Sequence, residues 1–221
     1  MMSNLFSIFD PSNSSFFKLN WLVMFLYFFM LPCQYWFMPN RYNFLFFLLL
    51  INLKKEIKSI INKNQFINIY LMMSIFLYIS YNNFMGLFPY NFTSTSHICI
   101  TIPLAMSLWL CFNLYNIIMK FNKLMSHMIP KNTPIMLSFF ICIIETISMF
   151  SRPISLSIRL AANMIAGHLL LNLLSSMIYN IFMWTSIMTP LMMLLFLEMM
   201  VSIIQSYVFI LLVVMYMNET K

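Results

Sequence analysis

The residues best suited to chemistry lie in one apolar stretch, residues 145–168, which reads ETISMFSRPISLSIRLAANMIAGH. At ~100° per residue, six polar side chains of this stretch fall within about 40° of one helical line. They are Glu145, Ser148, Arg152, Ser155, Arg159 and Asn163. His168 follows Arg159 by nine residues and points to roughly the opposite face. The stretch therefore predicts a helix with a polar stripe along an apolar body.

A second polar stripe lies in the last apolar segment, where Glu198, Ser202 and Gln205 follow one another at spacings of four and three. Glu and His exchange protons near neutral pH when their surroundings shift their pKa values, whereas Arg keeps its proton. A charge inside a membrane is costly and usually marks an ion or proton path. Arg159, flanked by titratable groups on two faces, is the fixed cation that a gated proton path needs, because it stops protons from leaking directly between those groups.

The composition indicates an all-α integral membrane protein that forms a single membrane domain over residues 1–221. Of its residues, 62% are hydrophobic and only 8% are charged, whereas a soluble domain carries about a quarter charged residues. The net charge of +7 comes from lysines and arginines in short connecting segments. These charges therefore report the orientation of the chain in the membrane, and we expect no nucleic-acid partner. The four cysteines form no CxxC pair and no cluster with histidines, so we expect no metal, cofactor or disulfide.

The first two thirds of the chain divide into an N-terminal part (residues 1–65) and a transmembrane hairpin (residues 66–120). In the first part, residues 19–38 predict a membrane span, and residues 41–62 predict an amphipathic helix on the membrane surface. The hairpin consists of spans over residues 66–88 and 98–119, joined by a polar turn. A basic loop with Lys120, Lys123, His127 and Lys131 follows.

The last third, residues 134–217, predicts two very long helices. Residues 134–180 contain only Pro153 as a strong helix breaker, and residues 181–217 contain only Pro190. Straight helices of these lengths would measure roughly 65 Å and 55 Å, against ~30 Å for the bilayer core. We therefore expect a steeply tilted hairpin, inclined by at least about 50° from the membrane normal, whose polar residues form the proton path.

The basic residues predict the orientation in the membrane. If the two middle spans form a hairpin, the basic residues before it lie on the same side as those after it. These are Arg41, Lys54, Lys55, Lys58 and Lys63, then Lys120, Lys123 and Lys131. The positive-inside rule makes this the cytoplasm-equivalent side, which also receives the C-terminal Lys221, and leaves the N-terminus on the other side.

Other readings stay open at this point. Arg159 could pair with Glu198 or Glu145 only to fix helix packing, and Arg152 beside Pro153 favours a structural or interfacial role. Gly167 permits close helix approach. A redox subunit needs paired intramembrane histidines, a secondary transporter needs internal repeats, and a protease needs motifs such as HExxH or GxSxG; none of these occurs. A purely structural anchor leaves both polar stripes unexplained.

The run RLAANMIAGH from Arg159 to His168 closely resembles the signature of the subunit a family of the F-type ATP synthase, in its mitochondrial form. The resemblance extends to Glu145, fourteen residues before the arginine, and to Glu198 followed by Gln205. It covers the whole chain and is weakest before about residue 65. It implies that Arg159 faces the carboxylates of a rotating c-ring.

The resemblance also implies the remaining roles. His168, Glu198, Asn163 and Gln205 would line a half-channel from the intermembrane space, and Glu145 and Ser148 would line a second one to the matrix. The implied partners are the c-ring, peripheral-stalk subunits, other small Fo subunits and the lipid bilayer. The implied location is the mitochondrial inner membrane, with the N-terminus in the intermembrane space and the C-terminus in the matrix. The chain would drive ATP synthesis without making ATP itself.

Overall fold

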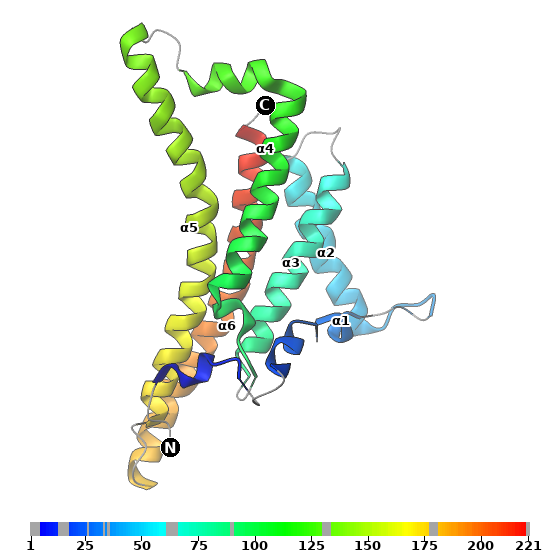
Figure 1. Ribbon diagram of the computed structural model, residues 1–221. Helices are drawn as coiled ribbons and strands as arrows, with labels where there is room; N and C mark the ends of the chain where they lie inside the picture. The colour runs from blue at the N-terminus through cyan, green and yellow to red at the C-terminus, as the bar shows by residue number, and fades with distance from the viewer. Residues whose placement is uncertain are drawn as a thin grey trace.

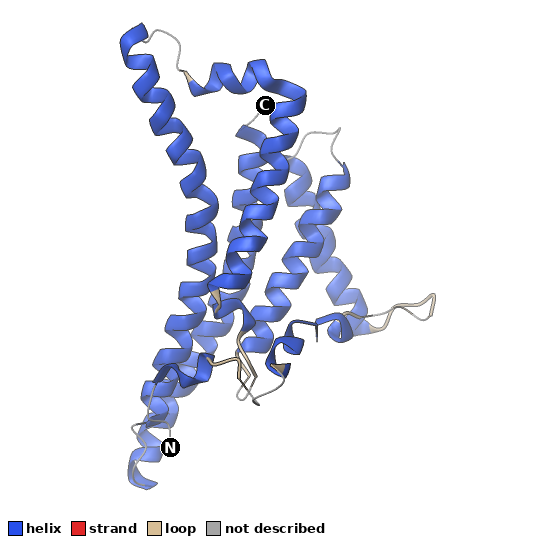
Figure 2. Cartoon of the chain, viewed as in Figure 1, coloured by secondary structure: helices blue, strands red, loops and turns tan. Residues whose placement is uncertain are grey.

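The chain folds into a bundle of helices. The computed structural model describes residues 5–12, 18–25, 27–32, 34, 36–60, 66–88, 91–129, 134–176 and 181–219. Every regular element in these ranges is helical (Figures 1 and 2). In chain order they are η1 (Leu5–Phe9), η2 (Leu19–Phe25), α1 (Tyr27–Met30), α2 (Arg41–Ile60), α3 (Phe66–Gly86), η3 (Ser94–Ser96), α4 (Ile98–Met128), α5 (Ile135–Ser176) and α6 (Ile181–Glu219).

Three of the described helices are long and apolar enough to cross a membrane. They are Ile98–Met119 within α4, Leu137–Ser176 within α5 and Ser186–Asn218 within α6. Together with the helical fold, they confirm the predicted class, an all-α membrane protein. The predicted span over residues 66–88 does form α3, but its tyrosines, serines and asparagines keep it out of this group. Its membrane crossing therefore stays a prediction.

The two C-terminal helices are as long as the sequence predicts. α5 has 42 residues and α6 has 39, which correspond to about 63 Å and 58 Å. Pro153 and Pro190 lie inside these helices without ending them. Figure 1 shows α5 as one continuous helix that bends along its length. The tilt of this hairpin in a bilayer stays a prediction.

Packing holds α6 between α3 and α5. α5 makes its most extensive contacts with α4, and α3 makes its most extensive contacts with α6. Met72 of α3 and Val214 of α6 are fully buried in the hydrophobic core, which also includes Leu156 and Leu160 of α5. One face of α5 is thus fixed against the bundle, which determines the direction in which its polar residues point.

The N-terminal region differs from the prediction. Residues 19–38 do not form one helix, because η2 ends at Phe25 and α1 ends at Met30. Pro32 accounts for the end of α1, since proline lacks a backbone N–H and disfavours helical geometry in the residue before it. α2 runs beside α3 in Figure 1 and contacts both α3 and α6. Its predicted position on the membrane surface stays a prediction.

The basic residues lie mainly at one end of the bundle. The C-terminal end of α2, which carries Lys54, Lys55 and Lys58, lies at the same end as the last turns of α4 (Figure 1). Arg41 does not belong to this group, because it begins α2 and lies at the helix's other end. The predicted basic loop is helical through Met128, since α4 continues past Lys120. Lys63, Lys131 and Lys221 lie outside the described residues.

Candidate functional site

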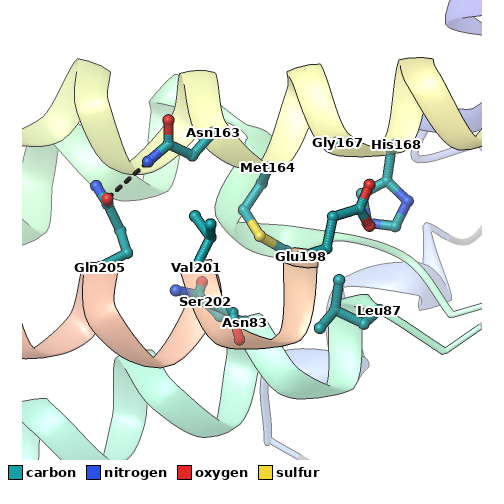
Figure 3. A pocket seen from close by; sticks show the side chains of 10 residues that line it. All are labelled: Asn83, Leu87, Asn163, Met164, Gly167, His168, Glu198, Val201, Ser202 and Gln205. Carbon is teal, nitrogen blue, oxygen red and sulfur yellow. Dashed lines mark hydrogen bonds between the residues drawn. The ribbon is translucent and has the colours of Figure 1, made fainter. Parts of the chain in front are cut away.

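A small cavity lined by both polar and apolar residues lies between α3, α5 and α6, and Figure 3 shows the ten residues that line it. Its volume is about 20 Å³. The resemblance assigned four residues to the half-channel from the intermembrane space, which we call the inlet: His168, Glu198, Asn163 and Gln205. All four line this one cavity. The lining residues are Asn83 from α3, Leu87 directly after α3, Asn163, Met164, Gly167 and His168 from α5, and Glu198, Val201, Ser202 and Gln205 from α6.

Glu198 is the acidic group of the cavity. Its side chain is only 9% exposed, and both carboxyl oxygens are buried without a hydrogen-bond partner among the described residues. Gly167 on α5 allows this placement, because a Cβ at that position would lie 2.8 Å from Oε1 of Glu198. The carboxyl group therefore keeps hydrogen-bonding capacity that no described residue uses.

His168 is the second titratable group of the cavity. Its imidazole lies against the backbone of Gly86, at the end of α3. Its Nε2 atom is buried and has no partner in the part of the chain that the structure describes. The sequence placed His168 on the face of α5 opposite Arg159. Because that face turns into the bundle, the structure brings His168 together with Glu198.

Asn163 and Gln205 join α5 to α6 at the other end of the cavity. The Nδ2 atom of Asn163 donates a hydrogen bond of 2.7 Å to Oε1 of Gln205 (Figure 3). Asn163 lies one helical turn after Arg159. The hydrogen bond therefore connects the outer face of α5, where Arg159 lies, with the cavity that contains Glu198.

Arg159 lies on the exposed face of α5. Arg159 does not pair with Glu198, because the carboxyl oxygens of Glu198 have no hydrogen-bond partner among the described residues. Glu145 is about 21 Å away along the helix, which is far beyond the reach of an ion pair. The residues around Arg159 on this face are mostly small, and small residues let another helix approach closely; they are Ser155, Ile158, Ala162 and Ala166, all exposed.

Glu145 and Ser148 were predicted to line the half-channel to the matrix, which we call the outlet. They do not line the cavity. They are half-buried and lie about 21 Å and 16 Å from Arg159 along α5, in the direction away from His168. The hydroxyl of Ser148 donates to the backbone oxygen of Glu145 at 2.8 Å. Arg159 therefore lies between the two predicted sets of residues.

Arg152 is engaged in packing between helices. Its Cζ atom lies 5.2 Å from the centroid of the Tyr216 ring on α6, a distance at which a guanidinium is attracted to the face of an aromatic ring. This contact agrees with the structural role that the sequence favoured for Arg152.

Asn83 is the polar lining residue that was not singled out from the sequence. It is fully buried, and neither its amide nitrogen nor its amide oxygen has a partner among the described residues. An asparagine pair in the predicted span over residues 66–88 was the available signal, since polar side chains inside a membrane are usually functional. Within the described ranges, no three His, Cys, Asp or Glu residues form a possible metal site.

Known proteins resemble this chain along its whole length. The family model described as "ATP synthase A chain" matches residues 16–218. The chain is 47% identical to ATP synthase subunit a of Drosophila melanogaster and to that of Anopheles gambiae, in both cases over the full length of both proteins. It is 46% identical to ATP synthase subunit a of Locusta migratoria over 99% of both. The similarity covers every helix that lines the cavity.

Proposed function

Because this chain belongs to the ATP synthase A chain family, we propose that it is the proton-translocating stator subunit of the Fo sector and that Arg159 separates its two half-channels. It is a multi-pass protein of the mitochondrial inner membrane. Its N-terminus faces the intermembrane space, and its C-terminus faces the matrix. Its partners are the c-ring, the peripheral stalk and the other small Fo subunits.

The exposure of Arg159 carries this proposal. An arginine inside a membrane is costly unless it faces a partner or water, and Arg159 has no acidic partner within reach among the described residues. The small exposed residues around it leave room for a helix of another chain. A carboxylate on the neighbouring c-ring is the partner of matching charge.

The inlet half-channel leads to the cavity with Glu198 and His168. A proton that enters from the intermembrane space passes these two groups and then neutralises a ring carboxylate. Asn163 and Gln205 line the last part of this route, because their hydrogen bond lies between the cavity and the face of Arg159. The neutral carboxyl group can rotate through lipid, where a charged carboxylate would be unstable.

The outlet half-channel lies along α5 on the other side of Arg159. After nearly a full turn, the ring carboxyl releases its proton near Glu145 and Ser148. The resulting carboxylate passes Arg159, whose positive charge stabilises the ionised form. A membrane potential biases the direction, at ~2.3 kcal/mol per charge per 100 mV. Proton flow is thereby converted into rotation, which drives ATP synthesis elsewhere in the complex.

The experiment that tests this function removes the separating charge. Arg159→Ala in the assembled synthase should abolish proton-driven ATP synthesis, because protons can then pass between the half-channels without turning the ring. Arg152→Ala is the matched control, since it removes the same side chain two helical turns earlier. Near-normal ATP synthesis by the Arg159→Ala enzyme, measured per assembled complex, would refute the proposal.

A further inference from the structure

The chain contains only two glycines, Gly86 and Gly167. Each lies against one of the two titratable groups of the cavity. Gly167 contacts the carboxyl of Glu198. The imidazole of His168 lies within hydrogen-bonding reach of the backbone of Gly86. Gly86 is the last residue of α3 and does not itself line the cavity, so it acts on the site through the residues that it contacts.

Space, and not backbone conformation, requires a glycine at the end of α3. A glycine that ends a helix commonly adopts the left-handed conformation, but the backbone of Gly86 does not. A Cβ at this position would lie 3.1 Å from Cε of Met164 on α5 and 3.3 Å from Cγ2 of Thr93. Both neighbours are buried, and both distances are tighter than ordinary van der Waals contact. The packing around Gly86 therefore leaves no room for a side chain.

Thr93 is held in place by hydrogen bonds. The side-chain oxygens of Thr93 and Ser96 are 3.0 Å apart, and the hydroxyl of Ser96 donates to the backbone oxygen of Thr93 at 2.7 Å. Both residues are buried. A methyl group at Gly86 would therefore push the end of Met164 aside or move the end of α3 away from its observed place.

We propose that Gly86 positions His168 by placing a backbone carbonyl of α3 against its imidazole. The inference rests on the proposed function, because it concerns a titratable group of the inlet. The last carbonyls of a helix have no partner within the helix, so the carbonyl of Gly86 can accept a hydrogen bond from a ring nitrogen. An imidazole held at one nitrogen keeps its orientation and presents the other nitrogen for proton exchange. That other nitrogen is Nε2, which is buried and has no partner among the described residues.

Gly86 is a positioning residue in this scheme, because it carries no titratable group. Its role parallels that of Gly167, which leaves room for the carboxyl of Glu198. The two glycines together determine where the imidazole and the acid lie in the wall of the cavity. Such placement affects rate, since a misplacement of ~1 Å can slow a reaction about a hundredfold.

The test compares Gly86→Ala with Ser80→Thr in the assembled ATP synthase. Both substitutions add one methyl group to α3, but Ser80 lies nearly two helical turns earlier and does not line the cavity. Gly86→Ala should slow proton-driven ATP synthesis per assembled complex by about fivefold, the effect of a displacement of a few tenths of an ångström. Ser80→Thr should stay within about twofold of the unmodified enzyme. Equal losses in both variants, or a loss below about twofold in Gly86→Ala, would overturn the proposal.

The dependence of the rate on inlet pH separates positioning from packing. If Gly86→Ala deprives the imidazole of a hydrogen bond, the inlet pH at which synthesis is half-maximal should shift by about half a unit. A packing defect lowers the rate by the same factor at every pH. An unchanged midpoint in a slowed Gly86→Ala enzyme would contradict the inference.

Met164→Leu provides a rescue of the same variant. It removes Cε, the atom nearest to the added methyl group, with little change in volume. Gly86→Ala should therefore slow the Met164→Leu enzyme by a smaller factor than it slows the unmodified enzyme. Equal factors in the two backgrounds would show that the crowding against α5 does not act on the rate.

A volume-conserving variant decides the question if Gly86→Ala lowers the amount of assembled complex. Gly86→Ala with Thr93→Ser moves one methyl group from one residue to the other and keeps the hydroxyl that meets Ser96. Its rate per assembled complex should lie at least about threefold below that of Thr93→Ser alone. Equal rates would refute the role of Gly86.

His168→Gln distinguishes the two levels of the argument. If it retains proton-driven ATP synthesis, His168 is not part of the inlet and the proposed half-channel itself fails. If His168→Gln loses activity while Gly86→Ala keeps it, the half-channel stands and only the role of Gly86 is refuted.

Discussion

Gly167 of α5 and Glu198 of α6 are in direct contact. A methyl group at Gly167 would lie 2.8 Å from Oε1 of Glu198 and 2.9 Å from its Cδ. Both distances are shorter than van der Waals contact, so only glycine at this position leaves the carboxyl in its observed place. The residue before His168 thus determines where the acidic group of the cavity lies.

Gly167→Ala should therefore impair proton transfer more than folding. The atoms that the new methyl group meets belong to the end of a flexible side chain, so Glu198 can turn aside while α5 and α6 keep their positions. A displacement of about 1 Å in a reacting group can lower a rate up to a hundredfold. We expect a normal amount of assembled complex and a rate of ATP synthesis at least about tenfold lower.

The control for this prediction is the double variant Gly167→Ala with Glu198→Asp. The shorter aspartate withdraws the carboxyl from the added methyl group, so the two losses should combine to less than their product. A Gly167→Ala enzyme with an unchanged rate would show that the position of the carboxyl does not limit proton transfer.

His168 and Glu198 should be partly interchangeable, because both titratable groups line one cavity. The exchange variant, His168→Glu with Glu198→His, keeps one acid and one imidazole in the same space. It should retain more proton-driven ATP synthesis than either single substitution. An equal or greater loss in the exchange variant would show that the two groups do not share one proton route.

Asn163 and Gln205 should behave as one unit. Their hydrogen bond of 2.7 Å connects α5 to α6, so breaking it from either side removes the same interaction. Asn163→Leu and Gln205→Leu should each slow ATP synthesis, and the double variant should be about as slow as the slower single variant. Losses that multiply would indicate that the two amides act independently.

Arg152 should contribute to stability rather than to proton transfer. Its contact with the Tyr216 ring is of a kind that contributes about 0.5–2 kcal/mol. Arg152→Gln and Tyr216→Leu should each lower the temperature at which the assembled complex dissociates, while ATP synthesis per complex stays within about twofold. Loss of synthesis in a normally assembled Arg152→Gln complex would contradict this assignment.

Helical periodicity predicted how the candidate residues are arranged on each helix, and the resemblance to the subunit a family implied which of them share a half-channel. Periodicity placed Arg159 and Asn163 on one face of α5 and His168 on the other, and the spacing of Glu198 and Gln205 grouped them on α6. Residues on one helix have a fixed angular relation, so a sequence reveals it. The long uninterrupted apolar runs predicted the lengths of α5 and α6 for the same reason.

The remaining features depend on contacts between distant segments. Asn83 belongs to α3, and nothing in its local sequence states that α3 packs against α6 beside Glu198. Arg41 shows the same limit. The sequence grouped it with Lys54 on one side of the membrane, but the two residues lie towards opposite ends of α2. In residues 19–38, apolar composition predicted one helix although Pro32 interrupts it, because hydropathy does not register backbone geometry.

The most direct test of the central claim is the distance between Arg159 and the c-ring in a structure of the assembled Fo sector. We predict that the guanidinium of Arg159 lies within about 6 Å of the nearest ring carboxyl, the range in which an opposite charge stabilises the ionised form. If every ring carboxyl lies more than about 10 Å away, roughly the distance at which salt screens exposed charges, Arg159 does not separate the two half-channels.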